Sequence, residues 1–168
     1  MNELPKGYEP AKYEDVIGEA ERESGLYNPD NLPGNRKEQF TMILPPPNAT
    51  GILHVGHAVM LALQDIVARF QRMRGKKVLW LPGTDHAAIA THSKVERILM
   101  EEEGKSRHDL GREAFVKRID EFVEDSRAII QHQMRKMGSS LDWSREAFTL
   151  DDERNVSVRT AFKRMYDD

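Results

Sequence analysis

The architecture of this 168-residue chain is set by residues 39–57, QFTMILPPPNATGILHVGH. Phe40 to Leu44 is apolar and β-prone, and the prolines at 45–47 end this strand because proline cannot donate to a sheet ladder. A tight turn at 48–51 and a helix follow, and Lys77 to Leu81 reads as a second buried strand. The order strand, turn, helix, strand predicts one right-handed βαβ crossover.

The connecting helix is expected to run from about His54 to Met73, with Gly75 where a C-terminal cap belongs. Its apolar residues recur at the spacing of an amphipathic helix: Val55, Ala58, Ala62, Ile66, Phe70 and Met73.

Two histidines occupy the first turn of this helix. The unpaired N–H groups and the dipole of a helix N-terminus favour an anion. His54 and His57 are three residues apart, so they share a face and can donate hydrogen bonds to a phosphate. Gly51 and Gly56 keep side chains away from a ligand that approaches the backbone. The turn therefore predicts a phosphate site.

Common phosphate and metal motifs do not fit this turn. Gly51 and Gly56 have the spacing of G-x-x-x-x-G-K-[ST], but His57 and Ala58 stand where Lys and Ser/Thr belong, and no G-x-G-x-x-G occurs. The pattern H-x-x-H also lacks the spacing and the glutamate of the zinc motif H-E-x-x-H. We predict no protein metal site.

Composition places few limits on function. The chain carries a net charge of −3, is 32% charged and has no cysteine, so disulfides and cysteine metal sites are excluded. No apolar run approaches the roughly 18 residues of a membrane span, and no apolar signal core is present at the N-terminus. We expect a cytoplasmic protein with no membrane partner.

The remaining segments are assigned from periodicity and turn residues. Residues 1–9 are expected to be mobile, and residues 1–36 to form a helical extension and loop ahead of the unit at 37–168. Helices are expected at 11–23, 87–103 and 112–137, with loops at 27–37 and 106–111. Thr149 with Asp152 approximates the capping box of a last helix.

These motifs together resemble one family. His54-Val-Gly-His57 is similar to the HIGH signature of class I aminoacyl-tRNA synthetases. With PPPNATG at 45–51, PGTDHAAIAT at 82–91 and LDWSREAFTLD at 141–151, the chain resembles the valine-specific members. The similarity covers about residues 37–168, with a fainter match at 8–29.

The resemblance implies an α/β fold. This would be the N-terminal half of a Rossmann-like catalytic domain, with a small parallel sheet and flanking helices. We interpret the chain as a fragment truncated before the editing domain and the KMSKS half.

The resemblance also implies a two-step reaction. The carboxylate of valine attacks the α-phosphate of ATP, giving valyl-adenylate and pyrophosphate, and the valyl group then passes to tRNA(Val). The catalytic residues would be His54 and His57. The ATP site would comprise Asn48, Thr50, Gly51, His54, Gly56 and His57. The valine site would comprise Pro45, Pro46, Asn48 and Asp85, with Asp85 on the α-ammonium. Magnesium would arrive with ATP, held by phosphates and water.

Two positions depart from the family pattern, and two other functions stay open. Ala88 stands where the family often has glycine, and His92 where glutamine is common. The alternatives are another HxGH nucleotidyltransferase, or a non-catalytic module that binds ATP or a partner. A sheet of two clear strands also leads us to expect marginal stability or self-association. As a fragment, the chain is expected to have weak or no activity alone.

Overall fold

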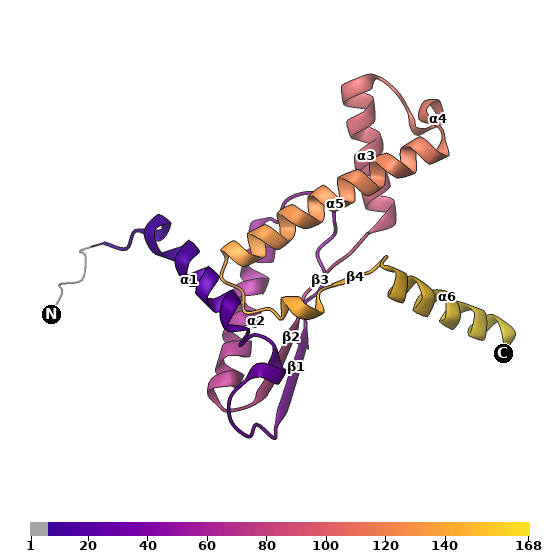
Figure 1. Cartoon of the computed structure of the whole chain (residues 1–168). Helices are drawn as coiled ribbons and strands as arrows, with labels where there is room; N and C mark the ends of the chain where they lie inside the picture. The colour runs from indigo at the N-terminus through magenta and orange to yellow at the C-terminus, as the bar shows by residue number, and fades with distance from the viewer. Residues whose placement is uncertain (1–6) are drawn as a thin grey trace.

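A parallel βαβ unit forms the base of the fold. The computed structural model describes residues 7–168, so the first six residues of the stretch 1–9, which we expected to be mobile, lie outside it. Strands β1 (Gln39–Ile43) and β2 (Lys77–Leu81) pair in parallel, with Met42 opposite Trp80. Helix α2 (Val55–Met73) connects them and lies along one side of the pair (Figure 1). The predicted order of strand, helix and strand, with parallel strands, is confirmed.

A second two-stranded sheet begins just after β2 in the chain. Strand β3 (Gly83–Thr84) pairs in parallel with β4 (Ala147–Phe148), a strand that the sequence did not predict. A Cβ on Gly83 would lie 3.1 Å from the carbonyl oxygen of Ala147, so glycine allows this close approach. Because β4 is far along the chain, no local pattern indicates the pairing.

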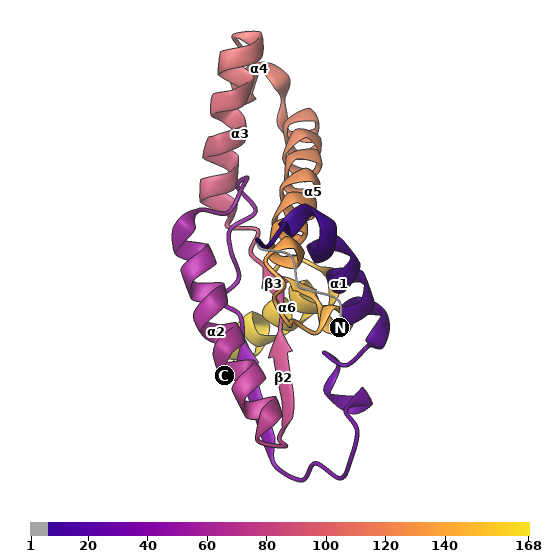
Figure 2. The ribbon, with the colours of Figure 1, turned by 90° about the vertical axis from the view of Figure 1, so that its left-hand side faces the viewer.

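Three helices form an arm beyond the sheets, visible in Figures 1 and 2. Helices α3 (Ala88–Glu103) and α5 (Arg112–Lys136) pack through an apolar cluster: Val95, Leu99, Phe115, Ile119 and Val123. Between them the predicted loop at 106–111 is wrong, because α4 (Arg107–Leu110) forms there. The Asp109 carboxylate accepts from the Ser106 N–H at 2.8 Å, a reciprocal cap that holds one helical turn.

The main core lies between α2, β2 and the C-terminal end of α5. It comprises Leu44, Leu61, Ala68, Val78, Trp80, Ile130, Met134 and Leu141.

The apolar residues that indicated the helix are not the ones that α2 buries. Val55 and Met73 are each 80% exposed and Ile66 is 64% exposed, whereas Leu61 and Ala68 are buried. Apolar residues surround much of this helix, and the two-stranded sheet covers only the side that carries Leu61 and Ala68.

The terminal helices rest on the surface. Helix α1 (Pro10–Ser24) ends at Gly25 as predicted, and a 3-10 turn, η1 (Pro29–Asn31), lies in the loop that follows. A second such turn, η2 (Trp143–Arg145), precedes β4. Neither α1 nor α6 (Asp152–Asp167) has a buried residue. Over residues 7–168, the helices are too short or too polar to span a membrane.

Helix α6 is capped by a residue other than the one predicted. The side chain of Asp151 accepts the Arg154 N–H at 2.9 Å. Thr149 is therefore not the cap, and its hydroxyl has other partners, described below.

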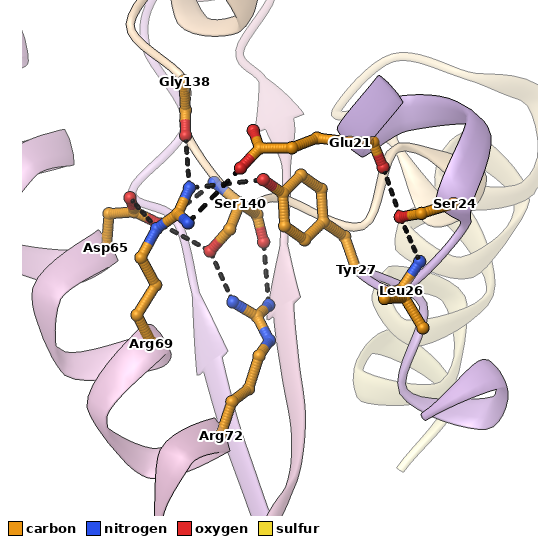
Figure 3. Close-up of polar contacts among 9 residues, drawn as sticks. All are labelled: Glu21, Ser24, Leu26, Tyr27, Asp65, Arg69, Arg72, Gly138 and Ser140. Carbon is orange, nitrogen blue, oxygen red and sulfur yellow. Dashed lines mark hydrogen bonds and ion pairs between the residues drawn. The ribbon is translucent and has the colours of Figure 1, made fainter. Parts of the chain in front are cut away.

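A polar network ties α2 to the segment after α5 (Figure 3). The carboxylate of Asp65 accepts from the Ser140 N–H at 3.0 Å and from Arg69 Nε at 2.7 Å. Arg69 also donates to the Gly138 carbonyl, and Arg72 to the Ser140 carbonyl. The network fixes the end of α5 against α2 and so orients the elements that carry the site.

Tyr27 joins the N-terminal loop to this network. The guanidinium groups of Arg69 and Arg72 lie 5.7 and 5.5 Å from its ring centroid. Burial, and secondly a hydrogen bond to Glu21, raises the pKa of the Tyr27 hydroxyl to about 12. Tyr27 therefore stays neutral at physiological pH and serves as an aromatic platform for the arginines.

Candidate functional site

Residues 54–57 form the HxGH turn, and its two histidines cap α2 reciprocally. His54 is the N-cap residue, and its Nδ1 accepts the Gly56 N–H at 3.1 Å. In return, the His54 N–H donates to Nδ1 of His57 at 3.2 Å. The rings lie with centroids 3.8 Å apart. His54 is exposed and His57 half-buried, so neither imidazole belongs to the apolar core.

These bonds assign the protons on both rings. A neutral imidazole that accepts at Nδ1 carries its proton on Nε2. Each histidine therefore has an Nε2–H donor that the cap does not use. Burial, and then the neighbouring His54, lowers the pKa of His57, which favours the neutral ring near pH 7. The turn thus presents two Nε2–H donors at the N-terminus of α2, an arrangement suited to an anion.

Gly51, before the HxGH turn, and Gly56, within it, are each required by the local geometry. Gly51 has a φ of +131°, a conformation that L side chains rarely adopt. Gly56 makes room for the imidazole of His54, a requirement additional to the ligand approach expected from the sequence.

A residue of α5 fixes the entrance to this turn. The Leu53 N–H donates to Oε1 of Gln133 at 2.8 Å, across 80 positions of the chain. Sequence reasoning missed Gln133, because it lies in a long helical pattern without a local signal.

The residues predicted to bind valine gather where two segments meet. Asn48 and Asp85 form a parallel β-bridge. The Asp85 N–H donates to the Pro47 carbonyl at 2.8 Å, and the Ala49 N–H donates to the Asp85 carbonyl at 2.7 Å. A Cβ on Gly83 would lie 3.9 Å from Cβ of Pro46, so this proline also borders the junction.

The other predicted residues adjoin this junction in sequence. Pro45 is exposed just after β1, and Thr50, whose N–H donates to the Asn48 carbonyl, is half-buried. The Asn48–Asp85 bridge therefore connects the stretch leading into the HxGH turn to the proposed ammonium partner.

One oxygen of Asp85 is held by the protein. Oδ1 accepts the Ala87 N–H at 3.1 Å and the Thr149 hydroxyl at 2.8 Å. Thr149 Oγ1 also accepts the His86 N–H at 2.9 Å. Sequence reasoning assigned Thr149 to a helix cap and so missed this contact, which spans 64 positions of the chain.

Two further histidines follow Asp85 in the sequence. The rings of His86 and His92 meet edge to face with centroids 6.2 Å apart, and each also faces a phenylalanine. Burial, and then His92, lowers the pKa of His86. Within residues 7–168, no cluster of three or more His, Cys, Asp or Glu side chains could hold a metal.

Comparison with known proteins identifies the family. A family model described as tRNA synthetases class I (I, L, M and V) matches residues 19–168. The chain belongs to the class I tRNA synthetases. The valine–tRNA ligases of Corynebacterium jeikeium and Thermus thermophilus are each 48% identical to it over 165 residues, 98% of this chain. That of Treponema denticola is 47% identical over the same share.

The match covers only part of these relatives. This chain spans 18–19% of their length. Among solved structures, the LeuRS of Agrobacterium radiobacter K84, in a ternary complex with tRNA and LeuAMS, superposes with a TM-score of 0.72. That match covers 95% of this chain and 18% of the other at 19% identity, and it shows the shared fold.

Proposed function

We propose that this chain supplies the HxGH part of a valine–tRNA ligase, binding ATP and valine for the formation of valyl-adenylate. The observation that carries the proposal is the reciprocal His54–His57 cap, connected to Asp85 through the Asn48–Asp85 bridge. The names of the relatives at 47–48% identity support valine as the amino acid. The family's catalytic unit is proposed to occupy residues 37–168, with 1–36 as an extension.

ATP is the nucleotide proposed for the HxGH turn. Attack by a carboxylate on a phosphate needs positioning and charge stabilisation and no protein nucleophile. The Nε2–H groups of His54 and His57 and the N-terminus of α2 supply donors for phosphate oxygens. Asn48, Thr50, Gly51 and Gly56 form the backbone around them. Magnesium, bound mainly by phosphate and water, would neutralise charge on the nucleotide.

Valine is proposed to bind beside the Asn48–Asp85 bridge. Asp85 lies just past β3, at the C-terminal end of parallel strands, where α/β sheets bind ligands. Its carboxylate would pair with the α-ammonium, and Pro45, Pro46 and Asn48 would border the side chain. In this pose the valine carboxylate would face a nucleotide bound at the HxGH turn.

The remaining partners follow from the same proposal. In the complete enzyme the valyl group would pass to tRNA(Val), and the compartment would be the cytoplasm. The other HxGH nucleotidyltransferases are disfavoured by the resemblance to valine–tRNA ligases across the chain. A non-catalytic ATP-binding module differs from our proposal in having no valine site, which binding can test.

The test measures binding of Mg·ATP and of L-valine to the 168-residue chain by calorimetry. We expect both to bind, and His57→Ala to weaken Mg·ATP by about tenfold, the effect of losing a hydrogen bond to a charged group. His132→Ala, at an exposed position of α5, is the matched control and should leave both affinities unchanged. Mg·ATP binding that is equal in His57→Ala and the wild type would contradict the phosphate role. ATP binding without valine binding would favour the non-catalytic module.

Self-association of the chain is proposed on the exposed side of α2. Val59, Leu63, Ile66 and Phe70 are all at least half exposed, and contiguous apolar surface of this kind favours association. We expect a concentration-dependent increase in sedimentation coefficient, and Ile66→Glu should abolish it. Ala128→Glu, at an already exposed position of α5, is the control. A monomer at all concentrations would contradict this proposal.

A further inference from the structure

The side chain of Thr149 makes contacts that are not needed to end β4 or to begin α6. It comes directly after β4, and its hydroxyl contacts two groups of the segment after β3. A carboxylate can only accept and a backbone N–H can only donate. The single hydroxyl proton is therefore committed to Oδ1 of Asp85, and the oxygen accepts from His86.

This contact makes the two oxygens of the Asp85 carboxylate differ in their hydrogen bonding. Oδ1 receives two donors, the Thr149 hydroxyl and the Ala87 N–H. Over residues 7–168, no protein donor is bonded to Oδ2. A carboxylate oxygen without a donor is the one with capacity for an incoming ammonium. Fixing Oδ1 also fixes the side-chain torsion and hence the direction in which Oδ2 accepts.

The strand that carries Thr149 is itself held in place. Strand β4 pairs with β3, and the Thr149 N–H donates to the Thr84 carbonyl at 3.2 Å. Arg127 of α5 also holds this strand. Its guanidinium carbon lies 4.3 Å from the centroid of the Phe148 ring, and its Nε donates to Thr84 Oγ1 at 3.2 Å. The hydroxyl therefore approaches Asp85 from a fixed frame.

A purely structural role in starting α6 does not account for Thr149, because Asp151 caps that helix. We propose that Thr149 is a positioning residue of the amino-acid site, which holds the Asp85 carboxylate so that one oxygen faces the α-ammonium of the substrate. This inference rests on the proposed function and deepens it.

Two substitutions at one position separate the hydroxyl from the rest of the side chain. Thr149→Val keeps the shape and removes the hydroxyl, whereas Thr149→Ser keeps the hydroxyl. Thr160→Val is the matched control, since the Thr160 hydroxyl donates to the Val156 carbonyl within α6, away from Asp85. All variants are made in the 168-residue chain.

The first measurement is the rotamer of Asp85, from NMR couplings across its Cα–Cβ bond in the absence of ligand. We expect a single rotamer in the wild type, averaging between rotamers in Thr149→Val, and a single rotamer again in Thr149→Ser. Thr160→Val should match the wild type. This readout does not depend on any ligand. An Asp85 rotamer that stays single in Thr149→Val overturns the positioning role.

The second measurement is the affinity for L-valine and for Mg·ATP. We expect Thr149→Val to weaken valine about tenfold, the size of one hydrogen bond to a charged group, and to leave Mg·ATP within about twofold. Thr149→Ser should restore valine binding. Equal loss of both ligands, or valine affinity unchanged in Thr149→Val, overturns the inference. Failure of the wild type to bind valine contradicts the proposed function itself, while the rotamer measurement still decides the role of Thr149.

Discussion

The imidazole of His54 lies directly over Gly56: a Cβ on Gly56 would stand 2.9 Å from Cε1 and 3.0 Å from Nδ1 of that ring. Real Cβ atoms essentially never approach so closely. The cap geometry of the HxGH turn therefore depends on glycine at its third position.

Gly56→Ala should displace the His54 ring and weaken Mg·ATP binding by about tenfold or more. Overall stability should change by less than about 1 kcal/mol, because the better helix propensity of alanine offsets the lost cap. Gly18→Ala in α1, where nothing lies within 4 Å, is the control and should stabilise by about 0.5–1 kcal/mol with ATP affinity unchanged. Calorimetry and urea unfolding check both. Undiminished ATP affinity in Gly56→Ala would contradict the geometry.

Stability should fall as the pH drops below about 6.5, the ordinary pKa of histidine. Burial lowers the pKa of His57 and of His86, so the unfolded chain binds protons that the folded chain resists. The contribution of these residues is complete above the unfolded pKa and is lost as the pH falls toward the folded pKa. Urea unfolding between pH 8 and pH 5 measures it. The double variant His57→Gln/His86→Gln should show a smaller loss over this range, and an identical loss would argue against both assignments.

Asp65→Asn should destabilise the fold by about 2–3 kcal/mol, because Asp65 accepts from Ser140 and pairs with the half-buried Arg69. Asp167→Asn removes a carboxylate that pairs with Lys163 on the exposed surface of α6 and should cost no more than about 0.5 kcal/mol. Equilibrium urea unfolding provides the comparison. Similar costs at the two positions would mean that the network in Figure 3 does not hold α2 against the segment after α5.

Ala87 has a left-handed backbone, with φ 49° and ψ 52°, at the start of α3. Alanine there is strained by about 1–2 kcal/mol, and glycine would avoid this strain. Part of that gain is offset because glycine loses more conformational entropy on folding. Ala87→Gly should therefore leave the Tm equal or higher, and Ala87→Val should lower stability by about 1 kcal/mol or more. Ala128→Val, in ordinary helix, should cost only about 0.5 kcal/mol. Thermal unfolding measures the Tm of each variant. A Tm of Ala87→Gly below that of the wild type would contradict the strain at Ala87.

Local patterns were sufficient for much of the fold. The prolines after β1, the helical spacing from His54 and the apolar run Lys77–Leu81 predicted the βαβ unit, and the structure has it. The HxGH turn was located as well, because helix starts and glycine turns depend on neighbouring residues. The functions assigned to Asn48, His54 and Asp85 stay predictions that the experiments above address.

Contacts between distant segments were beyond those patterns. Periodicity marks α2 as apolar but does not say which side meets the sheet, and Val55, Ile66 and Met73 proved exposed. Strand β4 and the bond from Thr149 to Asp85 depend on contacts between segments more than sixty positions apart. Neighbours along the chain set helices, strands and turns through backbone sterics. Burial and the aim of a side chain depend on surfaces that meet only after folding.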